Sequence, residues 1–414
     1  MRSSACRLRS VSLLLLLTAY LQLTTNFLTA RVLANCAEGQ RLLKSSWLSA
    51  YKALHRRGAK KLKAGKDVQV LVYTCHSGCG GVGDRITGML SAFYVAVATG
   101  RVFIIDHTSP VLLTTALLPK SIDWDLATYI RPHLKSETVY LVDAPKPMES
   151  LGNIMKAHLT GVQILRLQLN RYFVAMALWT PKQSLQAPSR RENIELIGDV
   201  YNSHMRFCSA PVRTKTTFYI AFHFLFRFSG EVLARAEGMY REVGFTTSQR
   251  FTGIHARLGG DVKSTSYTVP WEDPVRHAID DLPKFVDCAK SKAWNTSVGD
   301  MPILVISDSP TFKIASQEVH GTTHINSTVL FHTDRSSSDN ETILIQGNVD
   351  TYAELLLLSR AHCIVGSHSG FSGTAAAISD TNNGKERCFC MFDDCNNDSF
   401  DYFETSDRDR LRFK

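Results

Sequence analysis

The stretch that decides the fold is residues 68–106, which read VQVLVYTCHSGCGGVGDRITGMLSAFYVAVATGRVFIID. Val68–Tyr73 is an apolar run rich in β-branched residues, and such a run predicts a buried strand. After a glycine-rich turn, Ile86–Ala98 carries apolar residues at helical spacing. Gly100 is placed to end that helix, and Arg101–Ile105 predicts the next strand. Strand, turn, helix and strand in this order form a βαβ unit, from which parallel sheets are built.

A second series of strands and helices begins at Phe251, so the chain carries two α/β regions. We expect Asp350 or Thr351 to cap a helix that starts at Tyr352, with Thr351 and Glu354 forming a capping box. We therefore predict an α/β fold of two Rossmann-like domains, whose parallel sheets face a central cleft. The other predicted strands are Val139–Val142, Ile164–Gln168, Phe251–Leu258, Ile303–Ile306, Val329–Phe331 and His362–Val365, and the other predicted helices are Pro274–Lys290, Tyr352–Ser359 and Thr374–Ser379.

Composition and pattern divide the sequence into five parts. The length of 414 residues suits two domains of moderate size, each able to bury its own core. The parts are a signal peptide or membrane anchor at 1–34, a basic stem at 35–66, an N-terminal domain at 67–245, a C-terminal domain at 246–384 and a cysteine-containing tail at 385–414.

The positive charge is confined to the beginning of the chain. The sequence has 47 Lys and Arg against 38 Asp and Glu, a net charge of +9. Residues 1–66 contain 13 of the basic residues and only one acidic residue, whereas residues 67–414 contain 34 basic and 37 acidic residues. A folded nucleic-acid binder needs its positive surface on the fold itself, so we expect no nucleic-acid partner.

The first 34 residues have the pattern of a secretory targeting segment. Arg2, Arg7 and Arg9 precede an uncharged run from Ser10 to Ala30, about the length that spans a bilayer. The run is either a signal peptide, cleaved near Ala34, or a type II anchor whose basic flank stays in the cytoplasm. We expect a single-pass protein of the Golgi or ER membrane with a lumenal body, and a secreted protein is the alternative.

Sequons and cysteines agree with a lumenal location. Nine of the ten cysteines lie beyond the hydrophobic run, and clusters such as Cys75 with Cys79 predict disulfide bonds, whose pairing stays open. Cys363 lies in an apolar run and is expected to be a free thiol in the core. A zinc site is the competing interpretation of the cysteines, although no Cys-x-x-Cys pair occurs. Asn-x-Ser/Thr sequons begin at Asn295, Asn326, Asn340 and Asn397.

Between the targeting segment and the first strand, Gln40–Lys66 predicts a basic amphipathic helix. Leu43, Trp47, Tyr51 and Leu54 recur at helical spacing among lysines and arginines. We expect the apolar face of this helix to pack on the body and its basic face to be solvated. A position at the membrane surface is the alternative.

The glycine-rich turn after the first strand could bind a ligand. Glycines at a strand-to-helix turn let backbone amides approach an anion at the helix N-terminus. Gly78, Gly80 and Gly83 match the G-x-G-x-x-G pattern of dinucleotide binding, and Asp106 follows at the end of the next strand, where a ribose-binding acid would lie. These residues alone suggest an NAD(P) enzyme, and a tight turn capped by Asp84 is the simpler interpretation.

Polar groups also follow the strands of the C-terminal region. His255 and Arg257 are two residues apart on a strand and point to one face, and Arg can make a bidentate contact with phosphate. Asp261 follows them after two glycines. Asp308 directly follows a buried strand, and its carboxylate could accept a hydrogen bond from a nucleoside or cap the next helix. The segment Ser367–Ser372 presents hydroxyls and amides at a helix start, which suits phosphate oxygens.

In combination, these loops resemble those of the GDP-fucose-dependent fucosyltransferase superfamily, which includes the protein O-fucosyltransferases and the α1,6- and plant-type α1,2-fucosyltransferases. The resemblance implies a GT-B fold and metal-independent, inverting transfer of fucose from GDP-fucose to a glycan or protein hydroxyl. No Asp-x-Asp motif flanked by apolar strands occurs, which agrees with our expectation of no metal and no resident cofactor. The matching stretches, in the order of the family, are Gly81–Arg85, Phe103–Asp106, His255–Arg257 with Gly260–Asp261, Val305–Asp308 and Leu357–Ser372.

The resemblance also implies roles for single residues. Arg257 would neutralise the pyrophosphate, and His255 and Asp308 would contact the nucleoside. The base that takes the proton of the acceptor hydroxyl is open among Asp84, Asp106 and Asp261, and Gly259 adds one residue to the family's spacing before Asp261. The residues implied to bind phosphate are Ser367, Ser369, Gly370, Phe371 and Ser372, and those implied to face donor and acceptor from the other domain are Gly81, Gly83, Asp84 and Arg85.

Two other functions stay open at the level of sequence. One is an NAD(P)-dependent oxidoreductase that uses the Gly78–Gly83 turn and Asp106. It leaves the polar loops at His255–Arg257 and Ser367–Ser372 without a role. The other is a non-catalytic glycan-binding protein with the same fold.

Overall fold

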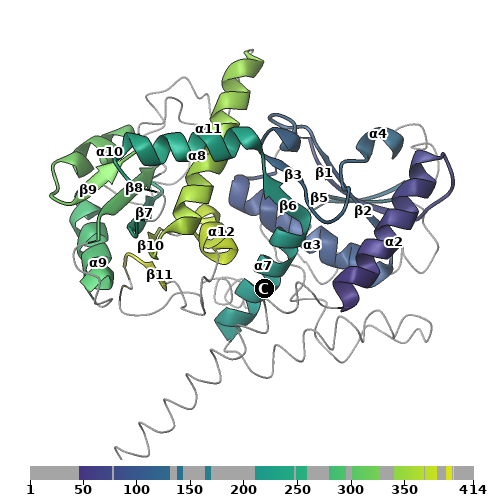
Figure 1. Ribbon diagram of the computed structural model, residues 1–414, viewed down its shortest axis with the longest axis horizontal. Helices are drawn as coiled ribbons and strands as arrows, with labels where there is room; N and C mark the ends of the chain where they lie inside the picture. The colour runs from purple at the N-terminus through teal and green to yellow at the C-terminus, as the bar shows by residue number, and fades with distance from the viewer. Residues whose placement is uncertain are drawn as a thin grey trace, which may run out of the picture.

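In the computed structural model, two parallel sheets and their helices form the body of the protein, which confirms the predicted α/β class. Figure 1 shows the two sheets side by side, with helices between them. The structure describes residues 46–76, 79–130, 138–142, 164–168, 210–246, 249–258, 279–294, 301–325, 340–367, 369–379, 388–393 and 395.

The N-terminal sheet has four parallel strands and contains the βαβ unit predicted from residues 68–106. α3 (Val82–Thr99) joins its first two strands and begins four residues before the apolar helical pattern. Gly100 ends α3 in the left-handed conformation, with φ 63°, as predicted. The strands lie in the order β2 (Val102–His107), β1 (Val70–Cys75), β5 (Ile164–Gln168) and β4 (Thr138–Val142).

The C-terminal sheet has five parallel strands with β7 in the centre. Its last strand, β11, lies in the segment 385–414 that we separated as a tail, so that segment contributes to the sheet. The predicted strand Val329–Phe331 lies outside the described residues. The strands lie in the order β11 (Cys388–Met391), β10 (Cys363–Gly366), β7 (Thr252–Ala256), β8 (Ile303–Ser307) and β9 (Thr322–His324).

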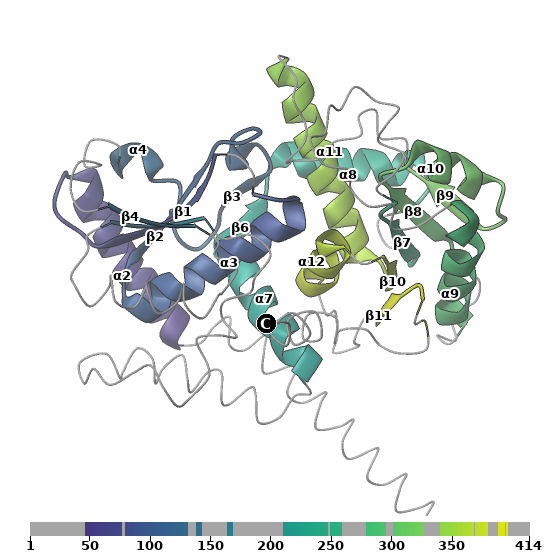
Figure 2. The same ribbon diagram turned by 180° about the vertical axis from the view of Figure 1, so that it is seen from behind.

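Four helices connect the two sheets. α12 (Gly370–Ile378) contacts α3 from the N-terminal half, and it also contacts α7 (Ala210–Leu225) and α11 (Glu341–Arg360). α8 (Gly230–Glu242) packs along α11, and Figure 2 shows this arrangement from behind. One apolar core runs through these helices and includes Phe93 of α3, Phe222 of α7, Leu357 of α11 and Ala376 of α12. Burial of this shared core fixes α3 and α12 relative to each other.

The remaining elements cover the outer faces or join the sheets. α9 contacts β7 and β10, α10 contacts β8 and β9, and α2 contacts β2. These elements are α2 (Ser46–Lys63), η1 (Leu113–Thr115), the antiparallel pair β3 (Leu117–Pro119) and β6 (Phe226–Phe228), α4 (Ala127–Ile130), η6 (Ile279–Asp281), α9 (Leu282–Trp294) and α10 (Pro310–Gln317).

The predicted start of the helix at Tyr352 is wrong, and so is the capping box of Thr351 and Glu354. α11 begins eleven residues earlier, at Glu341, where the side chain of the N-cap Asn340 accepts a hydrogen bond from the Thr342 N–H. Asp350 lies inside the helix, and its carboxylate is 2.8 Å from Arg235 Nε of α8. The helix extends further than predicted because α11 packs against α8. This tertiary packing stabilises a segment whose own sequence lacks a clear apolar period.

The predicted basic helix at Gln40–Lys66 corresponds to α2, within the part of it that the structure describes. Leu48, Tyr51 and Leu62 are buried, and the Tyr51 hydroxyl donates to the Arg101 carbonyl. The apolar face therefore packs on the body, as expected. The lysines and arginines of the other face are exposed.

Two of the cysteine predictions have an outcome. Disulfides join Cys75 to Cys79, which confirms a disulfide in that cluster, and Cys288 to Cys395, a pair that joins the C-terminal cysteine cluster to α9. The prediction of a free thiol at Cys363 is wrong, because Cys363 is disulfide-bonded. The buried free thiol among the described residues is instead Cys390, 3.6 Å from Cys288 Sγ.

The targeting segment at 1–34 lies outside the described residues. Within the described part of the chain, no helix has both the length and the apolar character that crossing a bilayer requires. Of the four sequons, only the one at Asn340 begins at a described residue, and Asn340 is exposed.

Candidate active site

Three neighbouring strands of the C-terminal sheet bring the predicted donor-side residues to one edge. Arg257, Asp308 and Ser367 follow β7, β8 and β10, the central strand and its two neighbours. Arg257 Nη1 lies 2.7 Å from Asp308 Oδ2, and the Arg257 N–H donates to Ser367 Oγ at 2.9 Å. The other carboxylate oxygen of Asp308 accepts from the Leu258 N–H at 2.8 Å. The Asp308 contact holds the guanidinium, and the two backbone contacts hold the end of β7, at the carboxyl edge of the sheet, where ligands bind in α/β folds.

Asp308 does not cap the next helix. Ser309 is the N-cap of α10, and its hydroxyl accepts from the Phe312 N–H at 3.1 Å. Because Ser309 takes this role, both carboxylate oxygens of Asp308 face Arg257 and Leu258. The structure thus separates two functions that the sequence left open for Asp308.

His255 connects the central strand to the start of α12. Its Nδ1 is hydrogen-bonded to Ser372 Oγ at 2.6 Å, and its ring stacks on Phe371 with centroids 4.8 Å apart. Ser369 is the N-cap of α12, and its hydroxyl accepts from the Phe371 N–H at 3.2 Å. Ser367 and Ser372 are buried. His255 therefore orients the first turn of α12, whose remaining N–H groups lie beside Arg257's strand end.

The N-terminus of α3 meets the N-terminus of α12. A Cβ atom on Gly83 would lie 2.3 Å from the Gly370 carbonyl carbon and oxygen, so only glycine permits this approach. Asp84 Oδ2 accepts from the Gly81 N–H at 3.3 Å, and Asp84 Oδ1 would lie 3.5 Å from a Cβ on Gly370. Two helix N-termini and the carboxylate of Asp84 therefore converge at one point, and a helix N-terminus favours negative charge.

Arg85 is buried, and its guanidinium is hydrogen-bonded to the glycine-rich loop. Its Nε donates to the Gly80 carbonyl at 2.8 Å, and its Nη1 donates to His107 Nε2 at 3.0 Å and to the Ser109 carbonyl. Nη1 also lies 3.3 Å from the sulfur of Cys75, and the disulfide bond joins Cys75 to Cys79 of the same loop. Burial and the nearby Arg85 charge lower the pKa of His107 to about 3, so its imidazole is neutral at pH 7.

Asp106, which the dinucleotide interpretation assigned to ribose binding, forms an ion pair. Arg166 Nη1 of β5 lies 3.0 Å from Asp106 Oδ2, and both side chains are buried. Sequence reasoning missed Arg166, although an arginine inside the apolar run Ile164–Gln168 is a signal of a buried partner. One oxygen of Asp106 is thus already engaged, and nothing in this geometry favours the oxidoreductase.

The structure brings most of the predicted residues to two facing groups. One group stands on the C-terminal sheet and α12, and the other stands on the start of α3, with Gly83 and Gly370 in contact between them. Arg85 supports the second group from inside the fold, and Asp261 lies outside the described residues. A guanidinium beside a helix N-terminus, facing a second helix N-terminus, is suited to a diphosphate.

No family model matches the sequence, and no curated protein matches it either. Among solved structures, a mutant of FUT1 from Arabidopsis thaliana in complex with GDP is similar over 81% of this chain and 77% of its own, with a TM-score of 0.51 and 17% identity. The likeness is one of fold. It confirms the GT-B-like arrangement that the resemblance of the loops implied.

Two further solved structures match with lower TM-scores. The α1,6-fucosyltransferase NodZ from Bradyrhizobium, co-crystallised with GDP, has a TM-score of 0.43 and 13% identity, and the match covers 74% of this chain and 91% of NodZ. POFUT1 in complex with GDP-fucose has a TM-score of 0.40 and 11% identity, and the match covers 78% of this chain and 98% of POFUT1.

Proposed function

We propose that the protein is a glycosyltransferase that transfers fucose from GDP-fucose to a glycan or protein hydroxyl with inversion. The observation that carries the proposal is Arg257 at the end of β7, held by Asp308 and Ser367 beside the N-terminus of α12. The motifs that resemble the fucosyltransferases converge at this point, and the FUT1 structure of similar fold was solved with GDP.

Departure of GDP defines what the site must do. As the bond between the anomeric carbon and the phosphate oxygen breaks, negative charge builds on the diphosphate. We assign neutralisation of this charge to Arg257 and to the first N–H groups of α12. In other enzymes, one such contact to the developing charge lowers the activation barrier by about 3 kcal/mol, which raises the rate ~10²-fold. In this proposal no metal is needed.

The location and the acceptor side are parts of the same proposal. The apolar run Ser10–Ala30 with its basic flank supports a type II protein of the Golgi or ER membrane, with secretion after signal cleavage as the alternative. The disulfides Cys75–Cys79 and Cys288–Cys395 support an oxidising lumen. The acceptor would be a glycan or glycoprotein that approaches from the side of α3.

Thermal unfolding with nucleotides tests the donor. GDP at 100 times its dissociation constant stabilises a protein by about 2.7 kcal/mol, so GDP should raise the melting temperature and NAD(P)H should not. Stabilisation by NAD(P)H alone would reverse the choice between transferase and oxidoreductase.

Turnover tests the role of Arg257. Arg257→Ala should lower GDP release from GDP-fucose about 10²-fold, while Arg241→Ala, at an exposed arginine of α8, should leave it unchanged. The Leu258 N–H still binds Asp308 in the first variant, so we expect it to fold. Near-normal turnover by Arg257→Ala would disprove the role of Arg257 in neutralising the diphosphate. If the wild-type protein binds GDP but neither hydrolyses GDP-fucose nor modifies a glycan array, it is a binding protein and not an enzyme.

A further inference from the structure

A second cluster of polar side chains lies at the carboxyl edge of the N-terminal sheet, around His76. His76 follows β1, and half of its side chain is exposed. A threonine hydroxyl holds each ring nitrogen: Thr74 Oγ1 lies 2.9 Å from Nε2, and Thr108 Oγ1 lies 2.9 Å from Nδ1. The imidazole is thus fixed in orientation but remains open to solvent on one side.

A buried ion pair stands behind this imidazole. Asp106 Oδ2 lies 3.6 Å from His76 Nε2 and 3.0 Å from Arg166 Nη1. Asp106 belongs to β2 and Arg166 to β5, so the two strands that flank β1 supply the pair. The arginine contact keeps the Asp106 oxygen in place, and the carboxylate is positioned to stabilise a positive charge on His76.

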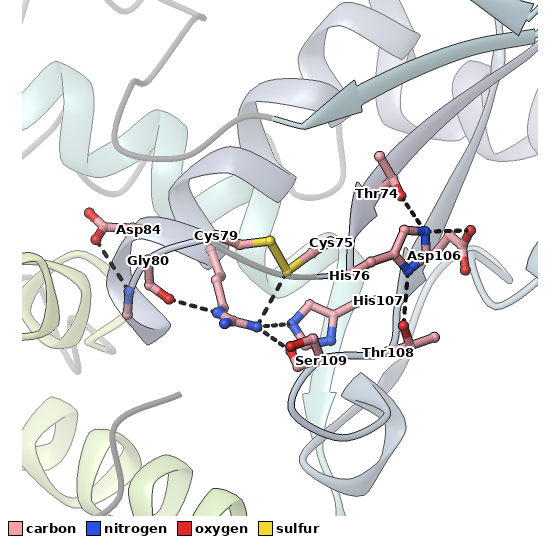
Figure 3. The surroundings of a disulfide bond; sticks show 12 residues. Thr74, Cys75, His76, Cys79, Gly80, Asp84, Asp106, His107, Thr108 and Ser109 are labelled. Atoms are coloured by element: carbon pink, nitrogen blue, oxygen red, sulfur yellow. Dashed lines mark hydrogen bonds and ion pairs between the residues drawn. A yellow bond between two sulfur atoms is a disulfide. The ribbon is translucent and has the colours of Figure 1, made fainter. Parts of the chain in front are cut away.

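The loop that carries His76 also carries the residues that face the donor side. The Cys75–Cys79 disulfide joins the residues on either side of this loop's start, and Arg85 binds the carbonyls of Gly80 and of Ser109 after β2. Figure 3 shows His76 with Asp106 at one end of this loop and Asp84 at the other. The same loop therefore carries both His76 and the residues at the point where α3 meets α12.

Two of the carboxylates considered for proton transfer, Asp84 and Asp106, are less suited to it. Asp84 is engaged with the Gly81 N–H at the start of α3. Asp106 is buried and paired with Arg166, so it has little access to an acceptor. Asp261 lies outside the described residues. His76, in contrast, has a half-exposed ring with a carboxylate behind it, and the Thr108 hydroxyl at its Nδ1 marks a position that an acceptor hydroxyl could take.

We propose that His76 accepts the proton of the acceptor hydroxyl during fucosyl transfer, with Asp106 as the residue that positions it. This inference rests on the proposed transferase function. The hydroxyl oxygen forms a bond to the anomeric carbon, the bond from that carbon to the GDP oxygen breaks, and GDP leaves with the electron pair. The hydroxyl proton passes to Nδ1 of His76, which becomes an imidazolium that faces Asp106.

The Asp106 carboxylate, 3.6 Å from His76 Nε2, favours the tautomer with the proton on that nitrogen. A proton on Nε2 lies on the side of Asp106 and donates to Thr74 Oγ1, so Nδ1 carries the lone pair and accepts from the Thr108 hydroxyl. Thr108 is only partly buried, and its hydroxyl occupies the position that the acceptor hydroxyl would take. The cluster is therefore built to bind a neutral hydroxyl next to a base.

Two variants and a matched control test the proposal on the full chain. His76→Gln should lower GDP release from GDP-fucose by about 10²–10³-fold, as expected for loss of a general base, and should keep the GDP-induced rise in melting temperature. His320→Asn, at an exposed histidine after α10, should change neither quantity. Turnover of His76→Gln within threefold of wild type would overturn the proposal.

The pH–rate profile separates a base from a residue that only supports the loop. The acidic limb should disappear in His76→Gln. Asp106→Asn should lower turnover but keep the acidic limb, because the ring loses the carboxylate that faces it while His76 itself remains. An acidic limb that persists unchanged in His76→Gln would disprove the proton transfer. A wild type that neither binds GDP nor turns over GDP-fucose would overturn the proposed function as well, whereas an active wild type with an active His76→Gln overturns only the assignment of His76.

Discussion

Replacing Gly83 by alanine tests whether α3 and α12 meet as closely as the structure shows. The added methyl would lie 2.3 Å from the Gly370 carbonyl carbon and oxygen and 2.8 Å from the Phe371 nitrogen. Non-bonded heavy atoms prefer about 3.5–4.0 Å, so the two helix ends must move apart by about 1 Å or more. Overpacking of this kind costs about 1–3 kcal/mol, and replacing a helical glycine by alanine returns about 0.5–1 kcal/mol. We expect a net loss of about 1 kcal/mol of unfolding free energy from these two effects, within a range of about 0–2.5 kcal/mol.

Gly238→Ala is the matched control, because this glycine also lies inside a helix. The nearest atom to its added methyl is Arg235 Nη1 at 3.8 Å, an ordinary contact. It should therefore stabilise the protein by about 0.5–1 kcal/mol through the backbone alone. Urea unfolding followed by circular dichroism measures both variants against wild type.

GDP binding provides a second readout for Gly83→Ala. Moving the first turn of α12 away from Arg257 should remove one charge-assisted hydrogen bond to the diphosphate, a loss of about 1.5–3 kcal/mol or ~10- to 100-fold in affinity. Isothermal titration calorimetry checks this value, and Gly238→Ala should bind GDP like wild type. A Gly83→Ala protein that is stabilised like Gly238→Ala and keeps wild-type affinity would refute the reasoning, because the two helices would then not touch at Gly83.

Three other expectations follow from the described contacts. Asp308→Asn should tighten the binding of inorganic pyrophosphate several-fold, because Arg257 loses a carboxylate 2.7 Å away; calorimetry that shows unchanged or weaker binding would contradict this. The double variant Cys288→Ser/Cys395→Ser should lose about 5 kcal/mol in urea unfolding and Cys75→Ser/Cys79→Ser only about 2 kcal/mol, since the sequence separations are 107 and 4 residues. Equal losses would disagree with loop entropy as the cause. The lowered pKa of His107, about 3, means that below pH 6.5 the unfolded chain binds a proton that the native protein does not. Acidification from pH 7.5 to 5 should therefore cost about 2 kcal/mol, and His107→Gln should reduce this slope.

Local patterns in the sequence predict the sheets well. β5 has the bounds of the apolar run Ile164–Gln168, and the βαβ unit from β1 to β2 ends its helix at Gly100 as expected. These elements follow from hydrophobic periodicity and from the conformational freedom of glycine, and both act over a few residues. The grouping of Arg257, Asp308 and Ser367 is also predictable, because neighbouring parallel strands end at one edge.

The parts that the sequence does not predict depend on distant partners. The resemblance implies that Arg85 faces the donor and acceptor. In the structure its side chain is buried against the carbonyls of Gly80 and Ser109, which only the folded chain brings together. Asp350 seemed suited to a helix cap, but it pairs with Arg235 of another helix. In each case the sequence pattern around the charged side chain is the same whether its partner is solvent, a ligand or a buried group. Only the tertiary contacts of the folded chain show which partner it has.

The candidate site also explains how a body with a net negative charge could bind an anionic donor. A large positive field is absent from residues 67–414 as a whole, and the strongest cation at the edge of the C-terminal sheet, Arg257, is already balanced by Asp308. The converging helix N-termini are balanced in the same way by Asp84. An anion must therefore exchange with carboxylates that are in place, so its binding depends on geometry more than on attraction at a distance. Such a site favours a ligand whose two phosphates fit both helix ends together over a single phosphate that reaches only one of them.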